Sequence, residues 1–154
     1  MKIVKYKDNF AKDVSKVIRE SYKQFCAKDA TSKAVSEYIE ENNYEKYPDK
    51  VKKKYAKSKI FFVALVKNKI IGFIKGTKNH VGNLFVLGKY HKLGIGRVLL
   101  EKFEREAIKQ KSKLIKLSSS LFAVNFYQRQ GYKKTTGIRN KKGNKIQPMK
   151  KLFL

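Results

Sequence analysis

The chain has 154 residues, with 38 Lys and Arg against 12 Asp and Glu, and its formal net charge is +26. This length fits a single domain spanning residues 1–154, and a hydrophobic content of 42% excludes wholesale disorder. The longest apolar run, Ile60 to Val66, is too short to cross a membrane. Charged residues interrupt the first ten positions, so we expect a cytoplasmic protein without a secretory leader.

The basic residues are mostly Lys, since only five of the 38 are Arg. Arginine is the residue that proteins favour for bidentate contacts with phosphates and bases. The composition therefore favours a solvated, lysine-rich surface over a dedicated nucleic-acid site, although a charge this high predicts some non-specific contact with nucleic acid. One Cys and two His give no basis for a metal site, and we expect none.

The first part of the chain is mainly helical in pattern. A short strand is expected over Lys2 to Tyr6, followed by an amphipathic helix from Phe10 to Phe25 whose apolar residues recur every three or four positions. A second helix is predicted from about Ser32 to Glu45. Pro48 stops or restarts it, and a short basic helix is expected over Lys50 to Ala56.

The remainder alternates strands with helices. Ile60 to Val66 and Ile70 to Ile74 flank a polar turn and predict a β-hairpin. The later elements, in chain order, are a strand Val81–Leu87, a helix from Arg97 to Ile108, a strand Leu114–Leu117, a short helix Phe122–Arg129, and strands Tyr132–Thr135 and Ile146–Phe153 joined by a basic loop Arg139–Lys145. The order β-α-α-β-β-β-α-β-α-β-β combines hairpins with a parallel crossover, which indicates an α/β fold with a mixed sheet.

The most informative segment joins one of these strands to the following helix and reads His91-Lys92-Leu93-Gly94-Ile95-Gly96. Two glycines allow a sharp turn that exposes backbone N–H groups at a helix N-terminus, where the helix dipole also favours an anion. Such a loop can bind phosphate or pyrophosphate. It matches neither the Walker pattern nor the three-glycine dinucleotide pattern. By itself, a Gly-x-Gly after a strand is more often a plain tight connection.

Together with a second motif, this loop resembles the acetyl-CoA signature of the GCN5-related N-acetyltransferase (GNAT) family. Both glycines fit the family pattern Gln/Arg-x-x-Gly-x-Gly/Ala, with His91 in the Gln/Arg position. Asn83 to Val86 resembles the strand that leads to that loop, and Phe122 to Tyr132 resembles the family's Ala-Val-x-Phe-Tyr segment. Gln147 to Lys150 is similar to the ending of one bacterial branch. The resemblance implies the acyl-CoA N-acyltransferase fold over most of the chain.

The resemblance also implies an activity: acetyl-CoA-dependent transfer of an acetyl group to a primary amine of a small molecule or peptide, by direct attack. Tyr127 is then expected to be the general acid that protonates the departing CoA thiolate, and a half-buried core aromatic is the alternative. A splayed strand would follow the pantetheine arm with free N–H groups, and the loop amides would hold the pyrophosphate. The residues implied at acetyl-CoA are Phe85, Val86, Leu87, His91, Lys92, Leu93, Gly94, Ile95, Gly96, Arg97, Ser120 and Asn125.

Some positions depart from the family pattern. Many members carry Glu near position 83 as a general base, whereas Asn83 cannot take a proton at neutral pH. His80 has a suitable ordinary pKa, but strand alternation is expected to place His80 and Asn83 on opposite faces, so a water relay is an equal alternative. Ser120 stands where the family often has Asn, and Asn125 is then an alternative contact or a plain helix-surface amide.

The acceptor site is expected near the first two helices, as in the family. Five of the twelve acids lie between residues 37 and 49, and none follows Glu106. Glu37 and Glu41, with Asn83 and His80, are therefore candidates for binding a cationic amine, and a solvent-facing acidic helix surface is the equal alternative. The acceptor stays open among a polyamine, an aminoglycoside-like amine, an amino-acid derivative and a protein N-terminus.

A second function stays open from the sequence alone, namely a basic module of the same fold that binds RNA or ribosomes and has lost catalysis. Asn83 and the charge of +26 favour this module, whereas the glycine loop and Tyr127 favour the enzyme. The family resemblance also makes a homodimer an expectation.

Overall fold

An eight-stranded mixed sheet forms the centre of the structure, a computed structural model that describes all residues 1–154. The strands are β1 (Lys2–Lys5), β2 (Ile60–Val66), β3 (Lys69–Thr77), β4 (His80–Val86), β5 (Leu114–Ser120), β6 (Lys133–Lys134), β7 (Arg139–Lys141) and β8 (Asn144–Leu152). The helices are α1 (Ala11–Phe25), α2 (Ser32–Glu41), α3 (Pro48–Ala56), α4 (Ile95–Lys109) and α5 (Val124–Arg129).

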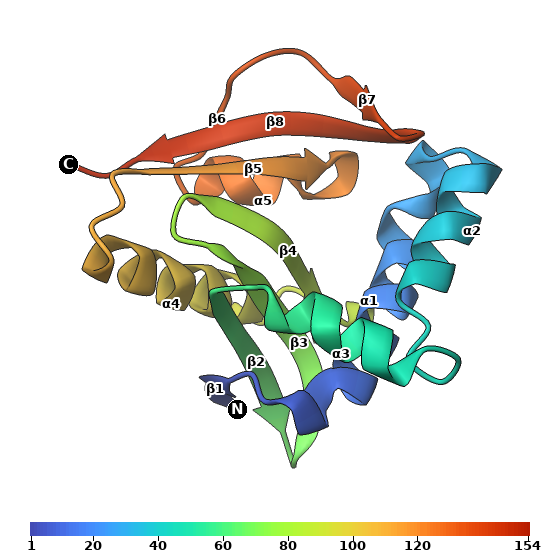
Figure 1. Cartoon of the computed structure of the whole chain (residues 1–154). Helices are drawn as coiled ribbons and strands as arrows, with labels where there is room; N and C mark the ends of the chain where they lie inside the picture. Colours follow the sequence, from blue (N-terminus) through green and yellow to red (C-terminus); the bar gives the residue numbers. More distant parts are fainter.

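The strand order in the sheet is β1-β2-β3-β4-β5-β8-β6, and β7 pairs with β8 beyond this path. Every pair is antiparallel except β4 and β5, which are parallel and connected through α4. In Figure 1, α1, α2 and α3 are separated by the sheet from α4 and α5. The α/β fold class with a mixed sheet is therefore confirmed.

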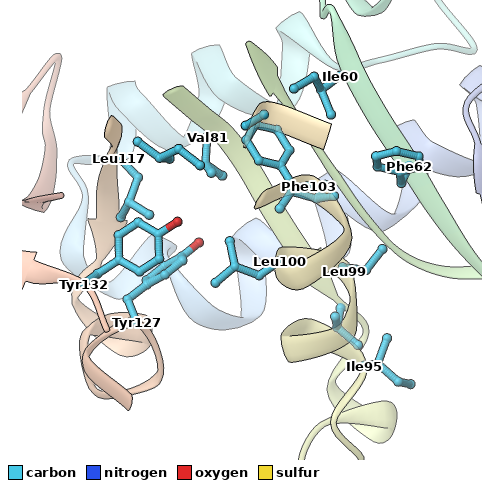
Figure 2. Close-up of a cluster of buried hydrophobic side chains, with 14 of the residues drawn as sticks. Ile60, Phe62, Val81, Ile95, Leu99, Leu100, Phe103, Leu117, Tyr127 and Tyr132 are labelled. Carbon is cyan, nitrogen blue, oxygen red and sulfur yellow. The ribbon is translucent and has the colours of Figure 1, made fainter. Parts of the chain in front are cut away.

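Two apolar cores lie on the two faces of the sheet. The core on the α4 side includes Phe62 of β2 and Leu99, Leu100 and Phe103 of α4, and part of it is drawn in Figure 2. The neighbouring Phe61 points instead to the core formed with α1 and α3. Burial on both faces explains why β2 is an uninterrupted apolar run rather than an alternating one. No helix combines the length and the apolar character that a membrane span requires.

The second helix ends earlier than the sequence predicts, at Glu41 instead of Glu45. The cause is Asn42, whose side chain is buried. Its Nδ2 donates to the backbone oxygen of Tyr38 at 3.0 Å, and its Oδ1 accepts from the Tyr55 hydroxyl at 3.0 Å. These bonds terminate α2 and join it to α3, which begins at Pro48 rather than near Lys50.

The basic segment Arg139 to Lys145, expected as a loop, contains β7 and a hairpin turn onto β8. Lys142 and Gly143 at the turn have φ values of 51° and 86°, the positive values that tight hairpins require. Thr31 N donates to the Gly143 oxygen at 2.9 Å, so this hairpin reaches across to the start of α2, as Figure 1 shows. The exposed residues of β7 carry no apolar alternation by which the sequence could have indicated a strand.

Candidate active site

β4 and β5 separate soon after they meet. Their parallel pairing is limited to His80 with Lys116 and Val81 with Leu117. β4 stays paired with β3 and β5 with β8, so the divergence opens a gap inside the sheet. A cavity of about 290 Å³ lies at this gap, and its walls come from α1, α2, β4, β5, α5 and the β7–β8 hairpin.

The two-residue alternation of β4 decides which backbone groups face the gap. Leu87 N donates to the Ile71 oxygen at 2.9 Å, and Phe85 lies opposite Phe73 in the ladder with β3. The N–H groups of Leu84 and Val86 therefore point the other way, toward the gap. The expectation of free N–H groups is consistent with Val86 and wrong for Phe85 and Leu87, whose N–H groups face β3.

The glycine loop ends at the N-terminus of α4. Gly94 precedes the helix with φ +80°, a left-handed conformation that glycine adopts without strain. The first intrahelical bond runs from Val98 N to the Gly94 oxygen at 3.0 Å, so the amides of Ile95, Gly96 and Arg97 have no acceptor within the helix. A Cβ at Gly96 would lie 3.4 Å from the Phe126 ring. The loop thus has the geometry of an anion cradle against which α5 packs.

His91 turns toward the sheet rather than along this loop. Its Nε2 lies 2.6 Å from the Val86 carbonyl oxygen, and its ring stacks on Phe25 with 4.5 Å between centroids. Phe122 packs on the same Phe25 ring. His91 therefore holds the end of β4, whereas the family resemblance implied a side-chain contact with acetyl-CoA. Lys92, with φ 62°, and the exposed Leu93 form the outer part of the loop.

Tyr127 lies on α5 at the wall of the cavity and is only 6% exposed. Its ring packs edge-on against Tyr132, with 5.7 Å between centroids, and Figure 2 shows the two rings next to each other near Leu117. Burial raises the pKa of the Tyr127 hydroxyl, and the nearby Cys26 raises it further. The hydroxyl therefore stays protonated at neutral pH, as a proton donor must.

A stacked tyrosine pair forms the opposite wall. The rings of Tyr22 in α1 and Tyr38 in α2 lie 3.9 Å apart at 15°. Asn83 donates from Nδ2 to the Tyr38 hydroxyl at 3.3 Å, and the Tyr22 hydroxyl donates to Asn144 Oδ1 at 2.6 Å. All four residues line the cavity. Asn83 thus holds Tyr38 in this part of the cavity wall. Its amide cannot accept a proton as a carboxylate would.

Three smaller polar residues also line the cavity: Cys26, Asp29 and Ser120. Burial is the main cause that raises the pKa of the Cys26 thiol to about 11, and Asp29 adds to the rise, while a hydrogen bond with Ser120 opposes it. The Ser120 hydroxyl also accepts from Ala123 N at 3.3 Å. Ser120 lines the cavity, whereas Asn125 is exposed on α5 and does not.

The predicted relation between His80 and Asn83 is wrong. The ladder with β3 pairs Lys75 with Asn83 but Gly76 with Val81, so Gly82 is an extra residue in a β-bulge. The bulge cancels the alternation and places His80 and Asn83 on the same face. His80 nevertheless lies outside the cavity lining. Burial and then Lys141 lower its pKa.

The acids predicted at the acceptor site lie outside this cavity. Glu37 and Glu41 do not line the cavity, and their side chains are 54% and 65% exposed. Glu37 lies 3.9 Å from Lys33, and Glu41 lies 3.8 Å from Lys54. The solvent-facing alternative therefore describes this helix surface.

The sequence did not indicate eight residues that line the cavity: Tyr22, Cys26, Asp29, Tyr38, Lys141, Lys142, Asn144 and Lys145. These residues come from segments more than a hundred positions apart that meet where Ala30 bridges Asn144. The tyrosines follow the apolar pattern of α1 and α2 and so have the same signature as core residues. The hairpin lysines lie in a sequence in which Lys is common everywhere, so they carried no local signal.

Known proteins provide an independent comparison. The profile of the acetyltransferase (GNAT) domain matches residues 15–153. A GCN5-related N-acetyltransferase of Rhodopseudomonas palustris superposes with a TM-score of 0.84 at 16% identity, covering 99% of this chain and 95% of that one. The PaiA N-acetyltransferase of Thermoplasma acidophilum, solved with coenzyme A, gives 0.76 at 22% identity over 99% and 98%. The aminoglycoside 6'-N-acetyltransferase of Enterococcus faecium gives 0.66 at 17% over 100% and 98%.

Proposed function

Because the chain belongs to the acetyltransferase (GNAT) family, we propose that this N-acetyltransferase uses acetyl-CoA and acetylates a primary amine held in the cavity between β4 and β5. The observation that carries this proposal is the position of the gap. Tyr127 lines the cavity at this gap, and the chain runs from β4 through the glycine loop to the N-terminus of α4, where three amides lack helical acceptors. A proton donor therefore lies at the cavity, and an anion cradle lies at the end of the loop that follows β4.

Binding is assigned to backbone groups more than to side chains. The free amides of Ile95, Gly96 and Arg97 would hold the pyrophosphate, aided by the positive end of the α4 dipole. The Val86 N–H, which points into the gap, would donate to the thioester carbonyl oxygen and stabilise the charge that develops there. This use of main-chain groups explains how His91 can face the sheet without loss of the cradle.

The chemistry follows from bringing the thioester of acetyl-CoA and the acceptor amine together in the cavity. Acetyl-CoA supplies an activated acetyl group as a thioester. The neutral amine nitrogen bonds to the carbonyl carbon as the carbon–sulfur bond breaks, and the amine proton leaves to cavity water. Tyr127 gives its hydroxyl proton to the departing sulfur and recovers one from solvent. Holding both reactants in one cavity supplies much of the acceleration.

The first experiment is calorimetric titration with acetyl-CoA at about 0.15 M salt, where charge attraction is screened beyond about 8 Å. We expect micromolar binding by the parent and loss of binding by Gly94→Glu, which adds strain and a negative charge at the cradle. Gly137→Glu is the matched control, because nothing lies within 4 Å of a Cβ at Gly137. This control should bind like the parent, and circular dichroism checks that both variants are folded.

Failure of the parent to bind acetyl-CoA would remove the enzyme proposal. The basic RNA- or ribosome-binding module would then take its place, with RNA affinity that falls steeply as salt rises. Equal acetyl-CoA affinity in the parent and Gly94→Glu would instead contradict the assignment of the cradle.

A further inference from the structure

Three lysines line the cavity: Lys141, Lys142 and Lys145. They belong to the β7–β8 hairpin, which Thr31 and Ala30 hold against the start of α2. Lys141 lies close enough to His80 to lower its pKa, so the cationic field extends over this side of the sheet. The charge along this part of the cavity is therefore positive, whereas the acids of α2 had suggested a negative acceptor site.

These lysines have no partner among the acids of the chain. The ion pairs of the structure are formed by Arg19, Lys33, Lys46, Lys54, Arg97 and Lys151. The three lysines line the cavity and are exposed, and no ion pair compensates their charge. A polycationic acceptor would meet like charge there, which costs affinity, whereas an anionic group would be attracted.

One carboxylate, Asp29, lines the same cavity. Its Oδ2 is fully buried and has no hydrogen-bond partner in the chain, which is rare for a buried polar atom and needs a donor. An incoming ammonium group could provide that donor before it loses a proton. The cavity therefore combines one acceptor atom for an amine with several cations for a second group.

We propose that the acceptor is a small amine that carries an anionic group, a carboxylate or a phosphate, with the anion held by the hairpin lysines and the amine by Asp29. This inference rests on the proposed function and specifies the substrate class of the same site. It excludes polyamines and aminoglycosides as preferred acceptors. The preferred acceptors are instead small amines with an acidic group, which is either a carboxylate or a phosphate.

The test compares amines that share a short chain and differ in the far group. Release of CoA is measured with 1,4-diaminobutane, 4-aminobutanamide, 4-aminobutanoate and 3-aminopropyl phosphate, which bear cationic, neutral, carboxylate and phosphate groups. We expect kcat/KM for at least one anionic compound to exceed that for 1,4-diaminobutane by at least about tenfold, and to fall as salt rises. The two anionic compounds separate carboxylate from phosphate recognition.

Variants locate the effect. Lys141→Glu with Lys145→Glu should abolish or reverse the preference. Lys133→Glu with Lys134→Glu, on the exposed β6, makes the same change in net charge away from the cavity and should retain it. Asp29→Asn should raise KM for the amine while acetyl-CoA affinity stays the same.

Calorimetry with acetyl-CoA on the same samples separates the two proposals. Suppose that acetyl-CoA binds but the cationic or neutral amine reacts as fast as the anionic amines, or that none of them reacts. The proposed anionic acceptor class is then wrong, and the assignment of acetyl-CoA stands. An unchanged preference in the Lys141 and Lys145 double variant would also overturn the inference. Absence of acetyl-CoA binding would remove the proposed function together with this inference.

Discussion

The Nε2 atom of His91 lies 2.6 Å from the carbonyl oxygen of Val86, the last residue of β4. This bond joins the glycine loop to the strand edge that faces the gap. The ring also stacks on Phe25 at the end of α1. One side chain therefore fixes the distance between the strand edge and the cradle.

Loss of this bond should weaken acetyl-CoA binding. His91→Phe keeps the stack on Phe25 but leaves the Val86 carbonyl without its donor, and we expect Kd for acetyl-CoA to rise about two- to tenfold, the value of one neutral hydrogen bond. His91→Gln retains an N–H donor and should stay within about twofold of the parent. Calorimetry measures both, and tighter binding by His91→Phe would contradict this role.

Removal of the Tyr127 hydroxyl should affect turnover and not binding. Tyr127→Phe preserves the buried ring, so we expect kcat for CoA release to fall by about 100-fold, within the range for general acid catalysis, while Kd for acetyl-CoA changes less than twofold. Because burial raises the pKa of Tyr127, its ionisation should cause no loss of activity below pH 10. Turnover equal to that of the parent would exclude Tyr127 from the mechanism.

Tyr132 offers a hydroxyl deletion of the opposite kind. Its hydroxyl donates to Glu104 Oε2 at 2.8 Å in the core, and Lys151 lies 3.2 Å from the same oxygen. Tyr132→Phe should lower the free energy of unfolding by about 1–3 kcal/mol, because the buried carboxylate loses a donor, and leave kcat nearly unchanged. Urea denaturation beside Tyr127→Phe checks this contrast. A larger stability loss in Tyr127→Phe would refute it.

Lys75 predicts a stability that depends on pH. Burial, followed by repulsion from Lys54, lowers its pKa from 10.5 to about 8. The unfolded chain therefore binds more protons than the folded one between these values, and stability rises with pH across that window. At pH 7 the penalty is fully present, at about 1–3 kcal/mol.

The variant Lys75→Met should remove this penalty. We expect its free energy of unfolding to exceed that of the parent by about 1–3 kcal/mol at pH 7 and by less than about 1 kcal/mol at pH 10. Lys116→Met, at an exposed position on β5, is the control and should show no such gain at pH 7. Denaturant unfolding at the two pH values measures these free energies. A gain in stability that is independent of pH would contradict the lowered pKa of Lys75.

The sequence indicated the features whose causes are local. Val14, Val17 and Ile18 recur at helical spacing and predicted α1, and the apolar run of β2 was placed within its observed bounds. The glycine loop was recognised because glycine permits backbone conformations that other residues avoid, and Gly94 has such a positive φ. Tyr127 was found through its motif, and the structure adds its burial at the cavity.

The tertiary structure alone decided which residues surround the cavity between β4 and β5. The β-bulge at Gly82 placed His80 and Asn83 on the same face, because one extra residue between them shifts the side-chain alternation by half a period. Asn42 ended α2 through bonds to Tyr38 and to Tyr55 of another helix. The hairpin lysines line the cavity because the β7–β8 hairpin lies beside α2. The bond between Thr31 N and the Gly143 oxygen that holds it there joins residues more than a hundred positions apart. Local patterns record helices, strands and turns, whereas the charge of a cavity depends on which distant segments meet there.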